Sequence, residues 1–318
     1  MKNDIKKNQS SKIVKIGIIG TGILGNAVGL HLLRSGYELT VYNRTKEKTN
    51  KLKINGAKVV NSPKNVAENS ELVIIIVKDA NAVKKVSFGK NGIVDGRHPG
   101  LTVADMSTIN PMESKKISKI FLKYKIIKLD IPVMGGPNVA INGELLLMGS
   151  GNKERFDKFK NVFNKIANKV FFVGGNGTAH LIKLSMNIQI TMLALALSEG
   201  ITLVKSAKID PRIFLDILNS TYFKTGMSEN KAYKMIQDNF EVTFTLKNLK
   251  KDISTITDTA KSFKINLPMI EKAKSVYSNA INKGFGDIDY TGILAYIEEI
   301  NKIQLKITKN NYKNKFIT

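Results

Sequence analysis

Three glycines, Gly20, Gly22 and Gly25, have the spacing G-x-G-x-x-G after an apolar, β-branched run and before a segment with helical spacing. In a strand–turn–helix unit the first glycine permits the tight turn, the second lets the backbone approach a pyrophosphate, and the third lets helix and strand pack closely. Amides at the helix start face the phosphates, aided by the helix dipole. The turn predicts a dinucleotide site, against a purely structural glycine turn, with contacts from Gly20, Thr21, Gly22, Ile23, Leu24 and Gly25.

The segment Val41–Thr45, at the end of the next expected strand, indicates which dinucleotide binds. NAD enzymes usually place Asp or Glu there to bind the ribose hydroxyls, and this segment contains no acid. A carboxylate would repel a 2′-phosphate, whereas Arg44 offers a bidentate partner and Asn43 and Thr45 offer hydrogen bonds. We expect NADP(H) to be preferred, with NAD(H) as a second option; an exposed loop arginine without a ligand is the alternative.

Lys183 and Asn187 interrupt a long, largely apolar segment, residues 178–207, whose spacing predicts one helix. Their i, i+4 separation places both on one helical face, one turn apart. A lone ammonium group in an apolar helix is costly unless it faces a cleft. The pair therefore indicates a polar site on this helix, and an exposed interfacial lysine is the alternative.

The elements that must position these groups alternate between strand and helix in the first half of the chain. Residues 72–77 are continuously apolar, as in a central parallel strand covered on both faces. The alternation predicts a doubly wound parallel sheet with right-handed crossovers. The expected strands are 13–20, 38–42, 57–60, 72–77, 101–105, 126–130, 144–148 and 170–173, and the expected helices are 23–34, 45–54 and 153–168.

After Gly177 the pattern is helical throughout, with further helices expected at 211–219, 227–238, 246–263, 268–283 and 289–307. The predicted fold class is therefore α/β, an N-terminal Rossmann doubly wound sheet followed by an all-α C-terminal domain. We expect an NADP-binding domain over residues 12–176 and an all-α domain for substrate binding and oligomerisation over residues 177–308.

Composition narrows the class of protein. Cys is absent, which excludes disulfides and thiolate chemistry, and neither His31, His98 and His180 nor any carboxylate cluster suggests a metal. No apolar run approaches the roughly 20 residues that span a bilayer, and the polar, basic N-terminus lacks a secretory signal. We therefore expect a cytoplasmic protein without membrane contact or metal.

The formal net charge is +24, which would suit a polyanion partner. Only five of the 50 basic residues are arginine, however, and Trp is absent. Specific nucleic-acid recognition depends on arginine and on aromatic stacking. We therefore expect a solvated, lysine-rich surface rather than a nucleic-acid site.

Four further motifs follow the glycine turn in order: Asp105-Met106-Ser107-Thr108, Asp130–Pro137, Gly177–Asn187 and Phe244–Asp252. With them the chain resembles the β-hydroxyacid dehydrogenases, the group that contains 3-hydroxyisobutyrate dehydrogenase, tartronate semialdehyde reductase and glyoxylate/succinic semialdehyde reductase. The resemblance runs from about Ile13 to about Ile307. It implies a homodimer or homotetramer.

The resemblance implies that loop 105–108 borders the nicotinamide and the substrate, with Ser107 on the substrate and Thr108 nearer the cofactor. Val77, which ends the expected strand 72–77, and Lys78, which follows it, are also assigned to the cofactor. A helix N-cap before Pro111 is the alternative for this loop.

The last motif resembles a segment that closes the site in this family. Lys251 would approach the cofactor, and Phe244 and Asp252 would line the substrate pocket. An amphipathic helix with solvated lysines is the alternative reading of this segment.

Met134 is the clearest departure from the family, which usually has D-x-P-V-S-G-G where this chain has Asp130–Gly136. There the loop amides and the serine hydroxyl hold the substrate carboxylate, and successive glycine amides can form an anion-binding nest. A thioether cannot donate a hydrogen bond. Either Gly135 and Gly136 bind the anion through their amides, with Met134 lining the pocket, or the substrate differs.

The resemblance also assigns the chemistry: Lys183 as general acid/base and Asn187 as its orienting partner. They would support hydride transfer between the nicotinamide and a small β-hydroxy acid, semialdehyde or glyoxylate-like oxo acid. Imine reductases, a related branch, typically lose this lysine, so Lys183 favours carbonyl–alcohol chemistry. An imine reductase-like or altered-substrate member remains an alternative because of Met134, and a weakly catalytic polyanion-binding protein remains one because of the charge.

Overall fold

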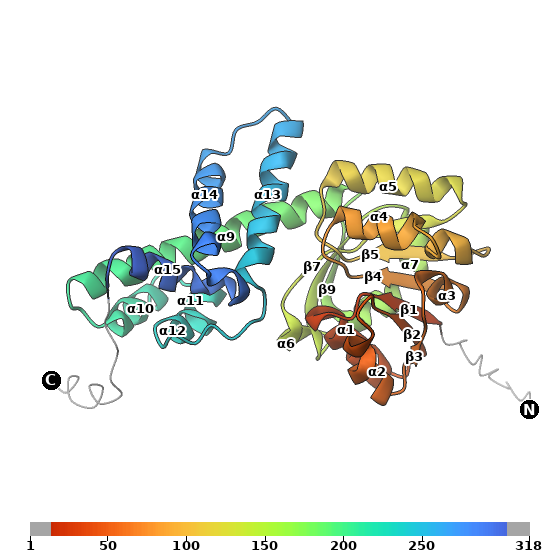
Figure 1. Cartoon of the computed structure of the whole chain (residues 1–318), viewed down its shortest axis with the longest axis horizontal. Coiled ribbons are helices and arrows are strands. Elements are labelled where there is room, and N and C mark those ends of the chain that lie inside the picture. The colour runs from red at the N-terminus through yellow and green to blue at the C-terminus, as the bar shows by residue number, and fades with distance from the viewer. Residues whose placement is uncertain (1–13, 304–318) are drawn as a thin grey trace, which may run out of the picture. The chain divides into compact units, whose positions relative to one another are not determined.

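The computed structural model describes residues 14–303, and the chain divides into two compact units between Lys183 and Leu184 (Figure 1). Helix α9 (Thr178–Ser206) runs through this division. The domain boundary expected from the sequence, at residue 176, falls just before α9 begins.

A six-stranded parallel sheet forms the centre of the first unit, in the order β3-β2-β1-β4-β5-β6. The chain builds outward from β1 in one direction and then from β4 in the other, so a topological switch point lies between these two strands. Ligands of open α/β sheets bind at the carboxyl ends of the strands near such a point. The strands are β1 (Ile16–Ile19), β2 (Leu39–Tyr42), β3 (Lys58–Val59), β4 (Leu72–Ile75), β5 (Thr102–Asp105) and β6 (Ile127–Asp130).

Helices cover both faces of this sheet, which is why β4 is apolar throughout. Leu72 and Ile74 face the layer that includes α1 (Ile23–Arg34), α2 (Asn50–Ile54) and α6 (Pro137–Ala140). Val73 and Ile75 face the layer of α3 (Pro63–Glu68), α4 (Ala80–Phe88) and α5 (Pro111–Lys123), on the opposite side of the sheet in Figure 1. This arrangement confirms the predicted doubly wound sheet.

A separate three-stranded sheet corrects one expectation. Residues expected to extend the large sheet instead form β8 (Leu145–Gly149) and β9 (Ala167–Phe172), and β7 (Val133–Met134) pairs antiparallel with β8. Only Ile131 and Pro132 separate β6 from β7, whereas a parallel crossover needs a dozen or more residues. The chain therefore folds back into a new sheet, and Gly135 continues the reversal with a φ of +115°.

Several helix bounds also differ from those expected. The helix predicted over residues 153–168 is broken at Phe159 into α7 (Lys153–Lys158) and α8 (Lys160–Ile166), and the first turn of residues 45–54 is a 3-10 helix, Lys46–Thr49. Helices α3, α4 and α5 were not predicted individually, although Ser62, Asp79 and Asn110 cap them with side-chain hydrogen bonds.

The second unit is helical, as predicted, and within residues 184–303 the only strand-like pairing is an isolated bridge between Thr245 and Asp289. The helix expected at 227–238 is two short helices, and the last described helix ends at residue 300; residues 304–307 lie outside the described part. Besides α9, the helices are α10 (Pro211–Asn219), α11 (Gly226–Asn230), α12 (Ala232–Met235), α13 (Leu246–Ser262), α14 (Pro268–Asn282) and α15 (Ile293–Ile300).

Helix α9 is long and apolar enough to cross a membrane by length and composition, and 33% of its most apolar window is buried. The expectation that no segment approaches spanning length was therefore wrong for this helix. Length and apolarity alone do not separate a spanning helix from a core helix, since both are long and apolar.

Candidate functional site

The glycine turn connects β1 to α1, with Gly22 as the N-cap residue of the helix. At Gly20, where φ is +102°, a Cβ atom would lie 2.1 Å from the carbonyl oxygen of Ile76, and at Gly25 it would lie 2.0 Å from the carbonyl oxygen of Gly20. Nothing lies within 4 Å of the corresponding position at Gly22. The turn is thus closely packed toward the sheet and open at Gly22, which fits a pyrophosphate approaching the start of a 12-residue helix.

Asn43 helps to build this turn. The amide of Thr21 donates to Asn43 Oδ1 at 3.1 Å, and Asn43 Nδ2 donates to the carbonyl oxygen of Thr45 at 2.8 Å. Arg44 and Thr45 are exposed. The guanidinium group of Arg44 is therefore the exposed cation of this segment that could meet a 2′-phosphate, while Asn43 is already engaged within the protein.

The ends of β4 and β5 bring two predicted residues together. The amide of Val77 donates to Ser107 Oγ at 3.0 Å, and the amide of Ser107 donates to Asp105 Oδ1 at 3.0 Å. Ser107 is buried and Thr108 is half-buried. Lys78 is exposed, and its Nζ lies 4.0 Å from Asp79 Oδ2.

Met134 and Lys183 are in contact, because Lys183 Nζ lies 3.1 Å from Met134 Sδ. Both side chains are half-buried, and Gly135 and Gly136 directly follow Met134. A Cβ at Gly135 would lie 2.6 Å from Val139 Cγ2, so the loop is also tightly packed. The first unit thus places the ammonium group of Lys183 at the loop expected to bind the substrate carboxylate.

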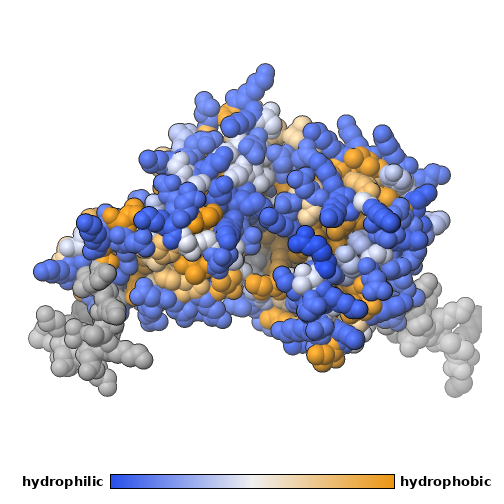
Figure 2. Space-filling model, in the orientation of Figure 1, coloured by the Kyte–Doolittle hydropathy of each residue, from blue (hydrophilic) through white to orange (hydrophobic). Residues whose placement is uncertain are grey.

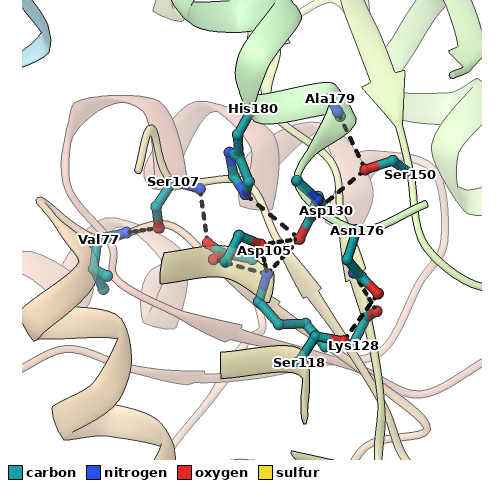
Figure 3. Close-up of polar contacts among 12 residues, drawn as sticks. Val77, Asp105, Ser107, Ser118, Lys128, Asp130, Ser150, Asn176, Ala179 and His180 are labelled. Carbon is teal, nitrogen blue, oxygen red and sulfur yellow. Dashed lines mark hydrogen bonds and ion pairs between the residues drawn. The ribbon is translucent and has the colours of Figure 1, made fainter. Parts of the chain in front are cut away.

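A buried cluster of ionisable side chains lies behind these loops, formed by Asp105, Lys128, Asp130 and His180 (Figure 3). Lys128 was not predicted as a functional residue. A signal was present in the sequence, since a lysine two residues before Asp130 in a buried strand must point to the same face as that carboxylate.

In the second unit, Asn187, Lys251 and Asp252 come together. Asn187 Nδ2 donates to Asp252 Oδ2 at 2.8 Å, and Lys251 Nζ lies 2.6 Å from Asp252 Oδ1. Asn187 is 1% exposed, and its Oδ1 accepts no hydrogen bond within the described residues. The polar face of α9 at Asn187 is therefore fixed by α13.

Phe244 lies in the segment before α13. Its ring centroid is 6.2 Å from that of Tyr290, and its amide donates to Asp289 Oδ2 at 3.2 Å. Asp289 also accepts from the amide of Thr243 and pairs with Lys231 Nζ at 3.0 Å. This buried carboxylate holds the segment in place.

Hydrophilic residues cover most of the face seen in Figure 2, with apolar areas between them. Several surface lysines pair with neighbouring acids, among them Lys153 with Asp157, Lys224 with Glu229 and Lys247 with Asp287. Between residues 14 and 303 no three His, Asp or Glu side chains are grouped so that they could hold a metal ion.

Comparison with known proteins matches both halves of the chain to family models. Residues 15–175 match the NAD binding domain of 6-phosphogluconate dehydrogenase, and residues 177–297 match the NAD-binding model of NADP-dependent 3-hydroxyisobutyrate dehydrogenase.

Relatives and a solved structure are similar over most of the chain. The uncharacterized oxidoreductase YfjR of Bacillus subtilis is 32% identical over 90% of this chain and 100% of its own length. Glyoxylate/succinic semialdehyde reductase 2 of Arabidopsis thaliana is 28% identical over 88% of this chain and 78% of its own. The crystal structure of 3-hydroxyisobutyrate dehydrogenase from Salmonella typhimurium has a TM-score of 0.81 at 24% identity, covering 89% of this chain and 99% of that one.

Proposed function

Because this chain belongs to the β-hydroxyacid dehydrogenase family, and is thus an NAD(P)-dependent oxidoreductase acting on CH–OH groups, we propose that it interconverts a small β-hydroxy acid and its semialdehyde, or reduces a glyoxylate-like oxo acid. The observation that supports this substrate class best is the position of Lys183 Nζ against Met134 in the loop that continues into Gly135 and Gly136. An ammonium group there meets the two needs of such a substrate, a cation near its anion and a proton donor near its carbonyl.

We propose NADP(H) as the preferred cofactor, with its pyrophosphate on the turn at Gly22 and its 2′-phosphate on Arg44. The exposed guanidinium group of Arg44 supports this assignment, as does the absence of an acid in residues 41–45. An arginine offers two parallel hydrogen bonds to a phosphate. The nicotinamide supplies or accepts the hydride when it is bound.

In the proposed mechanism the substrate carboxylate is held by the amides of Gly135 and Gly136 and by Ser107. Lys183 donates a proton to the carbonyl oxygen as it becomes an alkoxide, or accepts it in the reverse direction. General acid catalysis contributes on the order of 10²–10⁴-fold in rate.

Asn187 orients Lys183 and the substrate oxygen in this proposal, and Asp252 fixes the Asn187 amide. Holding the reacting groups in this geometry lowers the barrier further, because the substrate no longer has to find it.

A steady-state panel tests this assignment. Glyoxylate, succinic semialdehyde, tartronate semialdehyde and 3-hydroxyisobutyrate are each measured with the coenzyme in the required redox state, once as NADP(H) and once as NAD(H). We expect turnover of at least one compound, with a higher kcat/KM for NADP(H). Turnover of none of them with either coenzyme would contradict the proposed substrate class.

Met134 favours one second candidate, reduction of a cyclic imine, because a thioether in place of a hydroxyl donor makes this loop less suited to a carboxylate. Adding a cyclic imine to the panel distinguishes the two. Activity on the imine without activity on the semialdehydes would replace the first proposal by the second.

A further inference from the structure

Asp105 and Asp130 end neighbouring strands in register, so their side chains emerge side by side at the carboxyl edge of the sheet. Lys128 lies two residues before Asp130 and points to the same face. Its Nζ is 3.3 Å from Asp105 Oδ2, forms an ion pair with Asp130 Oδ1, and donates to Ser114 Oγ at 2.9 Å. Figure 3 shows this single ammonium group between the two carboxylates.

The cluster is closed to solvent. The side chains of Asp105, Lys128, Asp130 and His180 are each 0% exposed. Burial alone would lower the pKa of Lys128, but the charges of Asp130 and Asp105 outweigh it and raise that pKa. Two buried carboxylates thus depend on one buried cation, with His180 Nε2 a further 3.5 Å from Asp130 Oδ1.

Each of the two carboxylates also accepts a hydrogen bond from a backbone amide. Asp105 Oδ1 accepts the amide of Ser107 at 3.0 Å. Asp130 Oδ2 accepts the amide of Gly177 at 2.5 Å, just before α9 begins. Ser150 Oγ donates to Asp130 Oδ2 at 3.1 Å and accepts the amide of Ala179 at 3.2 Å, inside the first turn of α9. Loop 105–108 and the start of α9 are therefore both tied to the carboxylates that Lys128 joins.

We propose that Lys128 is a positioning residue for the reaction, because it holds three segments in one arrangement. These are the loop that carries Ser107, the strand end that leads to Gly135 and Gly136, and the helix turn that leads to Lys183. This inference rests on the proposed function for the roles of those residues. Lys128 acts through Asp105 and Asp130 and touches neither substrate nor cofactor.

A charge-matched variant separates positioning from simple charge compensation. Lys128→Met alone leaves two buried carboxylates without their cation, which is expected to destabilise the fold. Lys128→Met/Asp105→Asn removes one positive and one negative charge, so the net charge of the cluster equals that of the wild type. The Asn side chain still offers Oδ1 to the amide of Ser107.

Hydrogen exchange of single amides measures directly how firmly these segments are held, and it does not depend on activity. In Lys128→Met/Asp105→Asn we expect the amides of Ser107 and Gly177 to exchange at least about tenfold faster than in the wild type, with core amides of β1 and β4 unchanged. In Asp105→Asn alone, Lys128 still holds Asp130, so the Ser107 amide is expected to accelerate and the Gly177 amide to stay protected. Wild-type protection at both amides in both variants would overturn the proposal, and if the double variant does not fold, the single variant decides.

Kinetics test the consequence for the reaction. For the double variant we expect kcat to fall by up to about 100-fold, since small misplacements have effects of this size. Affinity for 2′-phospho-ADP-ribose, a cofactor fragment that needs only the turn and Arg44, should stay within about threefold of wild type. If the wild type turns over none of the panel compounds, the proposed function fails while amide exchange still decides the role of Lys128. An unchanged kcat with faster exchange would contradict the proposed role in the reaction.

Discussion

Lys183 Nζ lies 3.1 Å from Met134 Sδ, so the residue that departs from the family pattern contacts the residue that we propose as general acid. A serine at position 134 would offer a hydroxyl donor and acceptor, whereas a thioether is only a weak acceptor. In the proposed site, the surroundings of Lys183 therefore offer one hydrogen-bond donor fewer than the family pattern implies, and the proposed anion binding rests more heavily on the backbone amides of Gly135 and Gly136.

Met134→Ser is expected to restore the missing hydrogen-bond donor. One hydrogen bond to a charged group contributes about 1.5–3 kcal/mol, so KM for the best small carboxylate substrate should fall by about tenfold or more. Met134→Leu, which keeps the volume and removes the sulfur, is the matched control and should leave KM near its wild-type value. Steady-state kinetics check both variants, and a Met134→Ser enzyme with an unchanged KM would show that this side chain does not face the carboxylate.

Arg44→Ala is expected to raise KM for NADPH by about 10–100-fold and to leave KM for NADH unchanged, because only NADPH carries the 2′-phosphate. Lys46→Ala is the control, since Lys46 is a neighbouring exposed cation. Equal losses in the two variants would mean that general positive charge, rather than Arg44 itself, selects the cofactor.

Alanine substitutions at two glycines of the turn should impair different properties, cofactor affinity at Gly22 and stability at Gly25. Gly22→Ala places its methyl group in open space, so the protein should fold normally and lose NADPH affinity. Gly25→Ala would put a Cβ atom 2.0 Å from the Gly20 carbonyl oxygen, which should lower the free energy of unfolding by about 1–3 kcal/mol.

Gly175→Ala is the control for both glycine variants, because nothing lies within 4 Å of its Cβ position. Urea unfolding and NADPH fluorescence titration separate the two effects. Wild-type NADPH affinity in Gly22→Ala would argue against a pyrophosphate at this turn.

Lowering the pH should reduce the free energy of unfolding through protonation of Asp130. Burial alone would raise the pKa of this carboxyl, but Lys128, His180 and the amide of Gly177 together hold it well below its ordinary value. A carboxyl with a depressed pKa in the folded state contributes stability that is present above its unfolded pKa of about 3.9 and is lost as the pH falls toward the folded value.

Urea unfolding at several pH values between 7 and 3 measures this contribution. One such group changes the free energy of unfolding by at most about 1.4 kcal/mol per pH unit. Asp130→Asn should be less stable at pH 7 and should lose less stability on acidification. Parallel stability curves for the variant and the wild type would contradict the assigned shift.

The sequence predicted the parts of the structure that local patterns encode. Helix α1 and strand β4 follow from periodicity and from the glycine spacing at Gly20–Gly25. The family motifs implied that Lys183 lies near the loop that ends in Gly135 and Gly136. Its contact with Met134 was not implied, because the sequence marked Met134 only as a lost hydrogen-bond donor.

What the sequence missed depends on pairings between distant segments. The sheet of β7, β8 and β9 arises because two residues are too few for a crossover after β6. The alternation of strands and helices in the sequence does not reveal that these strands form a separate sheet. Lys128 was missed for the same reason: its role comes from Asp105 on the next strand and from Gly177 at the helix start. The hydrogen bonds that join Asn43 to Thr21 and Thr45 were also not predicted.

The most direct test of the proposed function is single-turnover transfer from NADPH that carries deuterium at both C4 positions, with the best carbonyl substrate from the panel, in the wild type and in Lys183→Ala. We predict that the wild-type product carries deuterium on the former carbonyl carbon, and that Lys183→Ala binds NADPH normally while the transfer rate falls on the order of 10²–10⁴-fold. A Lys183→Ala enzyme with the wild-type rate, or a product without deuterium, would contradict the account.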